Sequence, residues 1–287
     1  MISPGKGVSR VQVSRLAAGR FVDRKDVVTV EEPLEIRVEF TRGGLRETAA
    51  VSVTMRTPGN DFELAAGFLY GEGLLRSRED VAEISYCQSD EPQNYNIVLV
   101  KLRPTTRFDP DTLSRNFYMS SSCGVCGKAS LEAVEVRGCE QLPNEGLSVD
   151  PAILSGLPEK LRAKQGIFDR TGGVHAAGRF DEAGKLLSVH EDVGRHNAVD
   201  KVVGEAFLAG ELPLGRTLLA VSGRTSFEIM QKALAAGIPL VVGVGAPSSL
   251  AVDLARNFNI SLLGFAKAEG FNVYTGRERI AGSVPKS

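Results

Sequence analysis

The second half of this chain alternates apolar runs with helix-length segments, and this alternation constrains the fold more than any other feature. Residues 217–221 (TLLAV) are uniformly apolar, as in a strand that is buried on both faces. A helix-like segment at 226–235, a strand-like run at 238–244, a helix-like segment at 249–258 and a strand-like run at 261–266 follow in that order. Such alternation predicts a sheet with parallel strands that is covered by helices.

Further elements extend this predicted sheet. Residues 174–180 and 185–190 are expected to form a hairpin, and 195–208 has apolar residues at helical spacing. A strand at 271–274 is expected to close the edge of the sheet. Asp150 followed by Pro151 predicts the start of another helix, with an N-cap and a proline at its first position.

The first half has a different pattern. It predicts a small α+β unit with a mostly antiparallel sheet and one main helix. The expected strands and the helix are 27–30, 34–40, 50–55, helix 62–70 (capped by Asn60 or Asp61), 84–87 and 96–102. Residues 1–20 are expected to be a loose arm with at most a short strand at 11–13. We place two domains at 1–118 and 119–287, the second preceded by a cysteine-containing loop.

Composition narrows the functional classes. The chain has 287 residues, 43% of them hydrophobic and 24% charged, with a formal net charge of −1. A charge near zero gives no electrostatic footprint for nucleic acid or a membrane surface. No apolar run is long enough for a membrane span, and no signal peptide is visible. Four cysteines without framework spacing suit a reducing compartment, so we expect a cytoplasmic protein with no membrane insertion.

The most reactive-looking stretch is residues 120–128 (SSSCGVCGK), in which Cys123 and Cys126 have C-x-x-C spacing. A helix-compatible run follows, so we expect the pair on a tight loop near a helix N-terminus. Helix-end amides or a nearby cation lower a thiol pKa from about 8.5 and favour the thiolate. A reactive thiol is therefore the first interpretation, and a redox pair is the second.

Two weaker interpretations of the pair remain. A structural zinc site needs four ligands, and only Cys87, Cys139 and three histidines remain to complete one, without a second close pair. A buried, inert pair ranks last. We expect no metal site.

Polar, glycine-rich loops follow the predicted parallel strands. Residues 222–226 (SGRTS) and 243–249 (GVGAPSS) each lie between a strand and a helix. Ligands of such sheets bind beyond the carboxyl ends of the strands. Free amides at helix N-termini cradle phosphate, and Arg224 can pair with it. The alternative is that glycine and serine here serve only as helix caps.

Two further motifs concentrate polar chemistry. Residues 191–197 (EDVGRHN) contain two carboxylates, a guanidinium, an imidazole and an amide. This density favours a functional surface, although an ion-pair network would explain it too. His175 lies in a predicted strand after a double glycine. A lone histidine is more often a core residue than a ligand, and only its context favours function.

Together these stretches resemble one family, FdhD, the accessory sulfurtransferases of formate dehydrogenases. The resemblance rests on motifs that occur in the family's order over most of the chain: 57–64 (TPGNDFEL), 122–128 (SCGVCGK), 171–177 (TGGVHAA), 191–198 (EDVGRHNA) and 222–224 (SGR). It implies a dimeric protein whose larger domain is cytidine-deaminase-like, a three-layer α/β unit.

The resemblance also implies a sulfur carrier. A cysteine desulfurase gives sulfur to a loop cysteine as a persulfide, and the sulfur passes to the molybdenum or tungsten bis(guanine dinucleotide) cofactor of a formate dehydrogenase catalytic subunit. Cys123 matches the cysteine that holds the persulfide, and Cys126 matches the second cysteine, which assists or relays. No tightly bound metal of the protein's own is implied.

The resemblance places cofactor contacts at the segment 265–270, with weaker motif identity. To this predicted cofactor site we add residues that the motifs themselves suggest. The full set is Phe265, Ala266, Lys267, Ala268, Glu269, Gly270, Ser222, Gly223, Arg224, His175 and Arg195.

Three other functions compete with that of a sulfur carrier. A zinc deaminase needs H-x-E followed downstream by P-C-x-x-C, but Ala177 stands where the glutamate belongs and the C-x-x-C precedes the histidine. We reject that function. A thiol-disulfide oxidoreductase would need both cysteines equally. A non-catalytic binding module, such as a chaperone for the molybdenum cofactor, would tolerate the loss of both.

Overall fold

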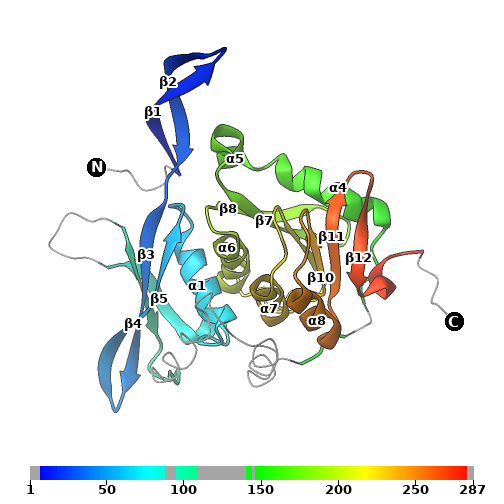
Figure 1. Ribbon diagram of the computed structural model, residues 1–287. Coiled ribbons are helices and arrows are strands. Elements are labelled where there is room, and N and C mark those ends of the chain that lie inside the picture. Colours follow the sequence, from blue (N-terminus) through cyan, green and yellow to red (C-terminus); the bar gives the residue numbers. More distant parts are fainter. Residues whose placement is uncertain (1–6, 88–94, 109–139, 144–145, 283–287) are drawn as a thin grey trace.

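The computed structural model describes residues 7–87, 95–108, 140–143 and 146–282 of the chain (Figure 1). Within them it is a mixed α/β protein with three sheets. The elements of the first half are β1 (Val8–Ala17), β2 (Arg20–Thr29), β3 (Glu32–Arg42), β4 (Leu45–Arg56), α1 (Asp61–Gly71), η1 (Arg78–Asp80), β5 (Val81–Tyr86) and β6 (Ile97–Leu102). Those of the second half are α4 (Pro151–Arg162), α5 (Gly166–Thr171), β7 (His175–Asp181), β8 (Leu186–Asp192), α6 (Arg195–Leu208), β9 (Thr217–Val221), α7 (Phe227–Ala235), β10 (Leu240–Gly243), α8 (Ser249–Asn257), β11 (Ser261–Lys267), β12 (Gly270–Thr275) and η2 (Arg277–Arg279).

The second half forms a six-stranded sheet in the order β12-β11-β10-β9-β7-β8. Strands β9, β10 and β11 are parallel, whereas β12, β7 and β8 pair antiparallel with their neighbours. The predicted strand and helix alternation, the hairpin and the edge strand are therefore confirmed. Helix α6 begins and ends at the predicted residues, and β9 does too.

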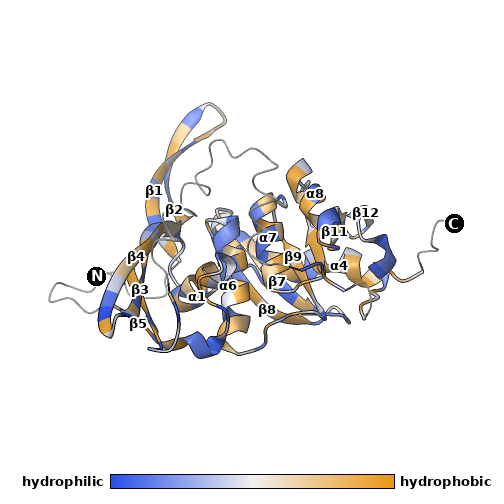
Figure 2. Ribbon diagram, turned by 90° about the horizontal axis from the view of Figure 1, so that it is seen from below, coloured by the Kyte–Doolittle hydropathy of each residue, from blue (hydrophilic) through white to orange (hydrophobic). Residues whose placement is uncertain are grey.

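Both faces of this sheet are covered, which explains the uniformly apolar strands. Leu219 and Val221 of β9 pack into a core with α6, α7 and α8, while Leu218 and Ala220 pack into a second core with α4. Successive side chains of a strand point to opposite faces. Each residue of β9 therefore meets a helix layer, and the strands appear hydrophobic in Figure 2.

The first half contains a four-stranded sheet in the order β4-β3-β6-β5. The β3–β6 pair is parallel and the other two pairs are antiparallel, as expected for a mostly antiparallel unit. Leu34, Ile36 and Val38 alternate along β3 with half-buried charged residues and are fully buried. They form one core with the apolar face of α1.

The expected loose arm at residues 1–20 is wrong for the described part of that segment. Strands β1 and β2 pair along their whole length, from Val8 with Thr29 to Ala17 with Arg20, and project from the body (Figures 1 and 2). Their turn places Ala18 and Gly19 at φ 48° and 76°. Two positive φ angles are typical of a type I′ hairpin, but alanine is rarely found there, so the sequence did not indicate the turn.

The two halves are joined by helices α1 and α6, which cross at glycines. A Cβ atom on Gly67 would lie 1.9 Å from the carbonyl oxygen of Asp200, and one on Gly204 would lie 1.8 Å from that of Glu63. Only hydrogen atoms fit between the two backbones here. The predicted boundary at residue 118 lies outside the described residues.

Across those parts of the chain that the structure describes, the helices are too short or too polar to cross a membrane.

Candidate functional site

The predicted strand-end loops meet at one edge of the six-stranded sheet. Residues 222–226 follow β9, 244–248 follow β10, and 265–270 include the end of β11 and its turn into β12. Because β9, β10 and β11 are parallel, their carboxyl ends lie at the same edge. Strand β7 is antiparallel to β9, so His175, its first residue, lies at this edge as well.

The loop after β9 is tied to the start of β7. The Ser222 hydroxyl accepts a hydrogen bond from the Ala176 N–H at 2.8 Å, and the Ser222 N–H donates to the Ala176 carbonyl at 2.9 Å. A Cβ atom on Gly223 would lie 3.2 Å from Nδ1 of His175. Gly223 therefore leaves space for the imidazole, and Ser222 holds the backbone in that position.

The loops after β9 and β10 also pack on each other. The Gly245 N–H donates to the Gly223 carbonyl at 3.0 Å, and a Cβ atom on Gly245 would lie 3.0 Å from the Arg224 nitrogen. The Thr225 hydroxyl and Nε of Arg195 are buried and have no hydrogen-bond partner within the described ranges. Buried polar atoms are rarely left unpaired, so the Nε of half-buried Arg195 is a donor that a ligand or water can satisfy.

Cations surround His175. Burial lowers the pKa of its imidazole, and the charges of Arg195, His196 and Arg224 lower it further. His175 and Arg195 are half-buried, whereas the Arg224 side chain is exposed. The guanidinium groups of Arg195 and Arg224, beside the neutral imidazole of His175, give this edge of the sheet a positive potential and hydrogen-bond donors. That combination suits an anionic ligand such as a phosphate ester.

Phe265 is the most unusual residue of the predicted segment 265–270. Its backbone has φ 52°, its N–H donates to the Gly245 carbonyl at 3.2 Å, and its side chain is 51% exposed. A non-glycine residue held in the left-handed region indicates a constraint that the surroundings impose. An aromatic ring exposed beside the strand-end loops offers a stacking surface.

The rest of this segment is less well placed. Ala266 is buried and packs in the core shared with α4. Lys267 and Glu269 are both exposed, and their charged atoms lie 3.7 Å apart. Ala268 and Glu269 form the turn, and Gly270 begins β12. Within 265–270, the bond to Gly245 joins only Phe265 directly to the neighbouring loops.

The two carboxylates of the 191–197 motif, Glu191 and Asp192, stabilise the fold. Glu191 accepts hydrogen bonds from the Ile167 and Phe168 N–H groups at the start of α5. Asp192 is fully buried and pairs with Lys201 at 2.7 Å. The ion-pair alternative is confirmed for Asp192, whereas the Glu191 carboxylate binds backbone N–H groups. Arg195 and His196, the basic residues of the motif, interact electrostatically with His175.

Sequence reasoning named His196 and Ser226 within two separate motifs, but it did not predict that they meet, and it missed Glu228. His196 lies between Ser226 and Glu228, with Nε2 2.9 Å from the serine oxygen and Nδ1 2.9 Å from a glutamate oxygen. The spacing of Ser226 and Glu228, two residues apart at the start of a helix, was a weak signal. Only tertiary structure brings His196, thirty positions earlier, between them.

The thiol chemistry cannot be placed on this framework. Cys123 and Cys126 lie outside the described residues. In the ranges that the structure does describe, no three His, Cys, Asp or Glu side chains gather closely enough to hold a metal ion.

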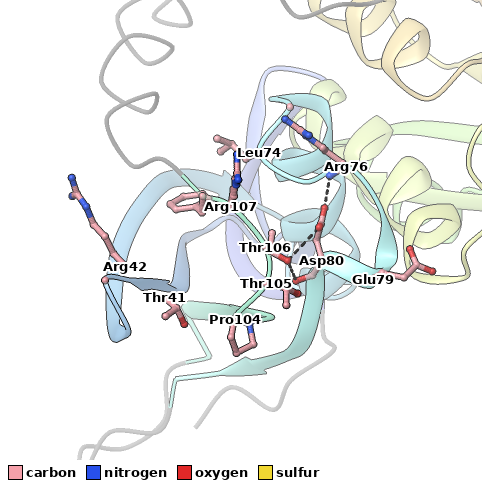
Figure 3. A pocket seen from close by; sticks show the side chains of 13 residues that line it. Thr41, Arg42, Leu74, Arg76, Glu79, Asp80, Pro104, Thr105, Thr106 and Arg107 are labelled. Atoms are coloured by element: carbon pink, nitrogen blue, oxygen red, sulfur yellow. Dashed lines mark hydrogen bonds between the residues drawn. The ribbon is translucent and has the colours of Figure 1, made fainter.

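A cavity of about 1180 Å³ lies in the first half of the chain, away from the predicted residues (Figure 3). It is lined by Thr41, Arg42, Gly43, Gly73, Leu74, Arg76, Glu79, Asp80, Pro104, Thr105, Thr106, Arg107 and Phe108. None of these belongs to a motif on which the resemblance rests. This cavity and the predicted site residues therefore lie at different places.

Fold and site define a mixed α/β protein whose strand-end loops gather cations around a half-buried histidine. The model of the FdhD/NarQ family matches residues 29–281. The chain belongs to the FdhD/NarQ family.

Close relatives span nearly the whole chain. It is 48% identical over 281 residues to the sulfur carrier protein FdhD of Streptomyces coelicolor, covering 96% of this chain and 97% of the relative. It is 50% identical over 275 residues to that of Mycolicibacterium paratuberculosis, covering 95% and 98%. A crystal structure of a candidate formate dehydrogenase accessory protein from Desulfotalea psychrophila has the same fold, with a TM-score of 0.74, 24% identity and coverage of 96% and 99%.

Proposed function

We propose that this protein is a sulfur carrier for formate dehydrogenase maturation. It accepts sulfur from a cysteine desulfurase as a persulfide on Cys123 and delivers it to the molybdenum or tungsten bis(guanine dinucleotide) cofactor. Relatives named as sulfur carrier proteins, 48% identical over almost the full length, support this function. The C-x-x-C pair that they would need is present at Cys123 and Cys126.

The loading step balances without an external oxidant. The Cys123 thiolate attacks the outer sulfur of the persulfide on the desulfurase. A new S–S bond forms on Cys123, the old S–S bond breaks, and the desulfurase cysteine leaves as a thiolate. Cys126 would assist or relay.

The observation that supports cofactor binding best is the cluster of cations around His175. A guanine dinucleotide carries a pyrophosphate, which Arg195 and Arg224 would bind. Ser222 and Gly223 fix the loop against His175, and Phe265 offers its ring to a base. Ala266, Lys267, Ala268, Glu269 and Gly270 complete the proposed contact segment.

The wider assembly belongs to the same proposal. The protein works in the cytoplasm as a homodimer, with a cysteine desulfurase and the catalytic subunit of a formate dehydrogenase as partners. Its domains are residues 1–118 and a cytidine-deaminase-like unit at 119–287. A mixed sheet with helices on both faces is compatible with that unit.

Loading of sulfur on Cys123 tests the proposal directly. After incubation with a cysteine desulfurase and cysteine, intact-mass measurement of the wild type should show a gain of one sulfur that reductant removes. The gain should vanish in Cys123→Ala, because the accepting thiolate is lost, and persist at least partly in Cys126→Ala.

Each rival function gives a different outcome in the same experiment. No sulfur uptake, with only a loss of two protons on oxidation, would indicate a disulfide oxidoreductase. Full dehydrogenase maturation by a variant that lacks both cysteines would indicate a cofactor chaperone. Zinc that is released when either cysteine is removed would make the loop structural.

Nucleotide affinity should depend on Arg224 and on the protonation of His175. Loss of a charge-assisted hydrogen bond costs about 1.5–3 kcal/mol, so Arg224→Ala should weaken guanosine diphosphate binding by about tenfold or more. Arg216, which lies before β9 and pairs with Glu182 on the surface, provides the matched control. Arg216→Ala should bind as the wild type does.

The sign of the pH effect follows from the lowered pKa of His175. The imidazole is neutral at pH 7.5 and gains a positive charge only below its ordinary range, so the anion should bind more tightly as the pH falls. Titration calorimetry of wild type and His175→Gln between pH 8 and pH 5.5 measures the difference. Protonation of guanosine diphosphate itself affects both measurements equally. Equal pH dependence of binding by the wild type and by His175→Gln would contradict the role assigned to His175.

A further inference from the structure

Three side chains at the candidate site form a hydrogen-bonded series that the proposed function does not use. The Ser226 hydroxyl lies 2.9 Å from Nε2 of His196, and Nδ1 of the same ring lies 2.9 Å from a carboxylate oxygen of Glu228. A hydroxyl, an imidazole and a carboxylate joined in this order are the arrangement that activates a nucleophilic or proton-transferring serine.

Ser226 has the place of a helix cap without acting as one. It is the N-cap residue of α7, yet its side chain makes no capping hydrogen bond. Ser248, the N-cap of the next helix α8, does accept the bond from the Ala251 N–H at 3.2 Å. Two serines in equivalent positions therefore differ, and the difference is the presence of His196 beside Ser226.

Glu228 fixes the ring from the other side. Its hydrogen bond with His196 lowers the pKa of the carboxyl, with a smaller contribution from the charge of that imidazole, so the carboxylate form is favoured. The Glu228 side chain is 45% exposed, whereas that of His196 is 32% exposed. The series therefore runs from the half-buried edge of the site to water, which lets a proton leave.

The series also lies beside the cations of the candidate site. His196 lies close enough to His175 to interact with it electrostatically, as Arg195 and Arg224 do. Ser226 immediately follows Thr225, whose N–H and carbonyl hold the loop after β10 through Ala246 and Ser248. A ligand held by Arg224 would thus have the Ser226 hydroxyl as a neighbour.

We propose that Ser226, His196 and Glu228 form a proton relay that serves an anionic ligand bound at the carboxyl edge of the sheet. The Ser226 hydroxyl is the group that faces the ligand. His196 takes its proton at Nε2, and Glu228 is a positioning residue that holds the ring and stabilises the imidazolium.

This relay has a use in sulfur delivery, and that use rests on the proposed function. A delivered sulfur that bears a hydrogen must lose it to become a thiolate-type ligand. In that step the S–H bond breaks and its electron pair stays on sulfur. The proton moves to the Ser226 oxygen while the hydroxyl proton moves to His196, so no oxidant or reductant is needed.

Covalent labelling tests the relay independently of sulfur transfer. With diisopropyl fluorophosphate, the Ser226 oxygen forms a bond to phosphorus, fluoride leaves and the hydroxyl proton passes to His196. Peptide mapping by mass spectrometry should find the label on Ser226 at least about tenfold faster than on Ser248 of the same protein. His196→Gln should slow labelling of Ser226 by about 100-fold, in the usual range for loss of a general base.

A conservative pair of variants separates positioning from packing. Glu228→Gln should slow the labelling of Ser226, and Glu228→Asp should restore part of the rate, with unchanged melting temperatures in both. Labelling of Ser226 no faster than of Ser248, or a rate unaffected by His196→Gln, would overturn the proposal. The hydrogen bonds of His196 with Ser226 and Glu228 would then serve only to hold α6 against α7.

A second readout separates this proposal from the proposed function. Ser226→Ala should load sulfur on Cys123 within about threefold of the wild type, because loading does not involve this edge of the sheet, yet activate formate dehydrogenase at least about tenfold less well. Full activation by that variant would overturn the use of the relay in delivery. Failure of the wild type to load sulfur would instead contradict the proposed function and leave the labelling result standing.

Discussion

Replacing Gly204 by alanine is expected to destabilise the protein by about 3 kcal/mol or more. The added Cβ would lie 1.8 Å from the Glu63 carbonyl oxygen and 2.7 Å from the Gly67 nitrogen. Both are backbone atoms of α1, so no side chain can rotate away. The helices would have to separate, which breaks the packing between the two halves of the chain. Urea unfolding measures the loss.

The matched control for this substitution is Gly156, which also lies inside a helix. A Cβ atom there would meet no heavy atom within 4 Å. Alanine is the better helix former by up to about 1 kcal/mol, so Gly156→Ala should leave stability unchanged or raise it. If both variants behaved alike, the close approach of α1 and α6 would not be a determinant of stability.

Asp192→Asn is expected to cost about 3–5 kcal/mol, because it leaves the Lys201 ammonium buried without its counter-charge. The two groups are 2.7 Å apart, and both side chains are almost completely buried. Asp192 also accepts hydrogen bonds from the Thr57 and Gly194 N–H groups and from the Asn197 amide. Chemical unfolding with a two-state analysis gives the free energy.

A double variant checks the cause. Asp192→Asn combined with Lys201→Met removes both charges, so the combined loss should be smaller than that of Asp192→Asn alone. A double variant less stable than the single one would mean that the hydrogen bonds of Asp192, rather than its charge, determine the effect. Because Thr57 and Lys201 belong to different halves of the chain, the same network also fixes how the halves meet.

Local sequence patterns were enough to predict the six-stranded sheet. The uniformly apolar residues 217–221, the helix at 195–208 and the hairpin at 175–192 are specified by burial on two faces, by helical spacing and by turn residues. The strand-end loops were predictable too, since parallel strands present their carboxyl ends together. By contrast, the β1–β2 hairpin was not predicted, because its turn uses Ala18 and its strands bury few side chains.

Only part of the candidate site could be predicted from local sequence patterns. His175 and Arg224 stood out beside glycines and Arg195 in a dense polar motif, and the fold does gather them. Nothing local distinguished Asp192, which is structural, from Arg195, three residues later, which faces His175. Burial and partners decide such roles, and both depend on segments more than a hundred residues away, as the Thr57–Asp192 bond illustrates.

The sequence by itself determined the order of strands and helices in the six-stranded sheet, the C-x-x-C motif and membership of the family, because these depend on residue types and short spacings. Only the tertiary structure decided that α1 and α6 meet backbone to backbone at two glycines, and that His196 lies between Ser226 and Glu228. Such contacts join atoms that are distant along the chain. They become favourable only once the whole core has fixed the helices in place.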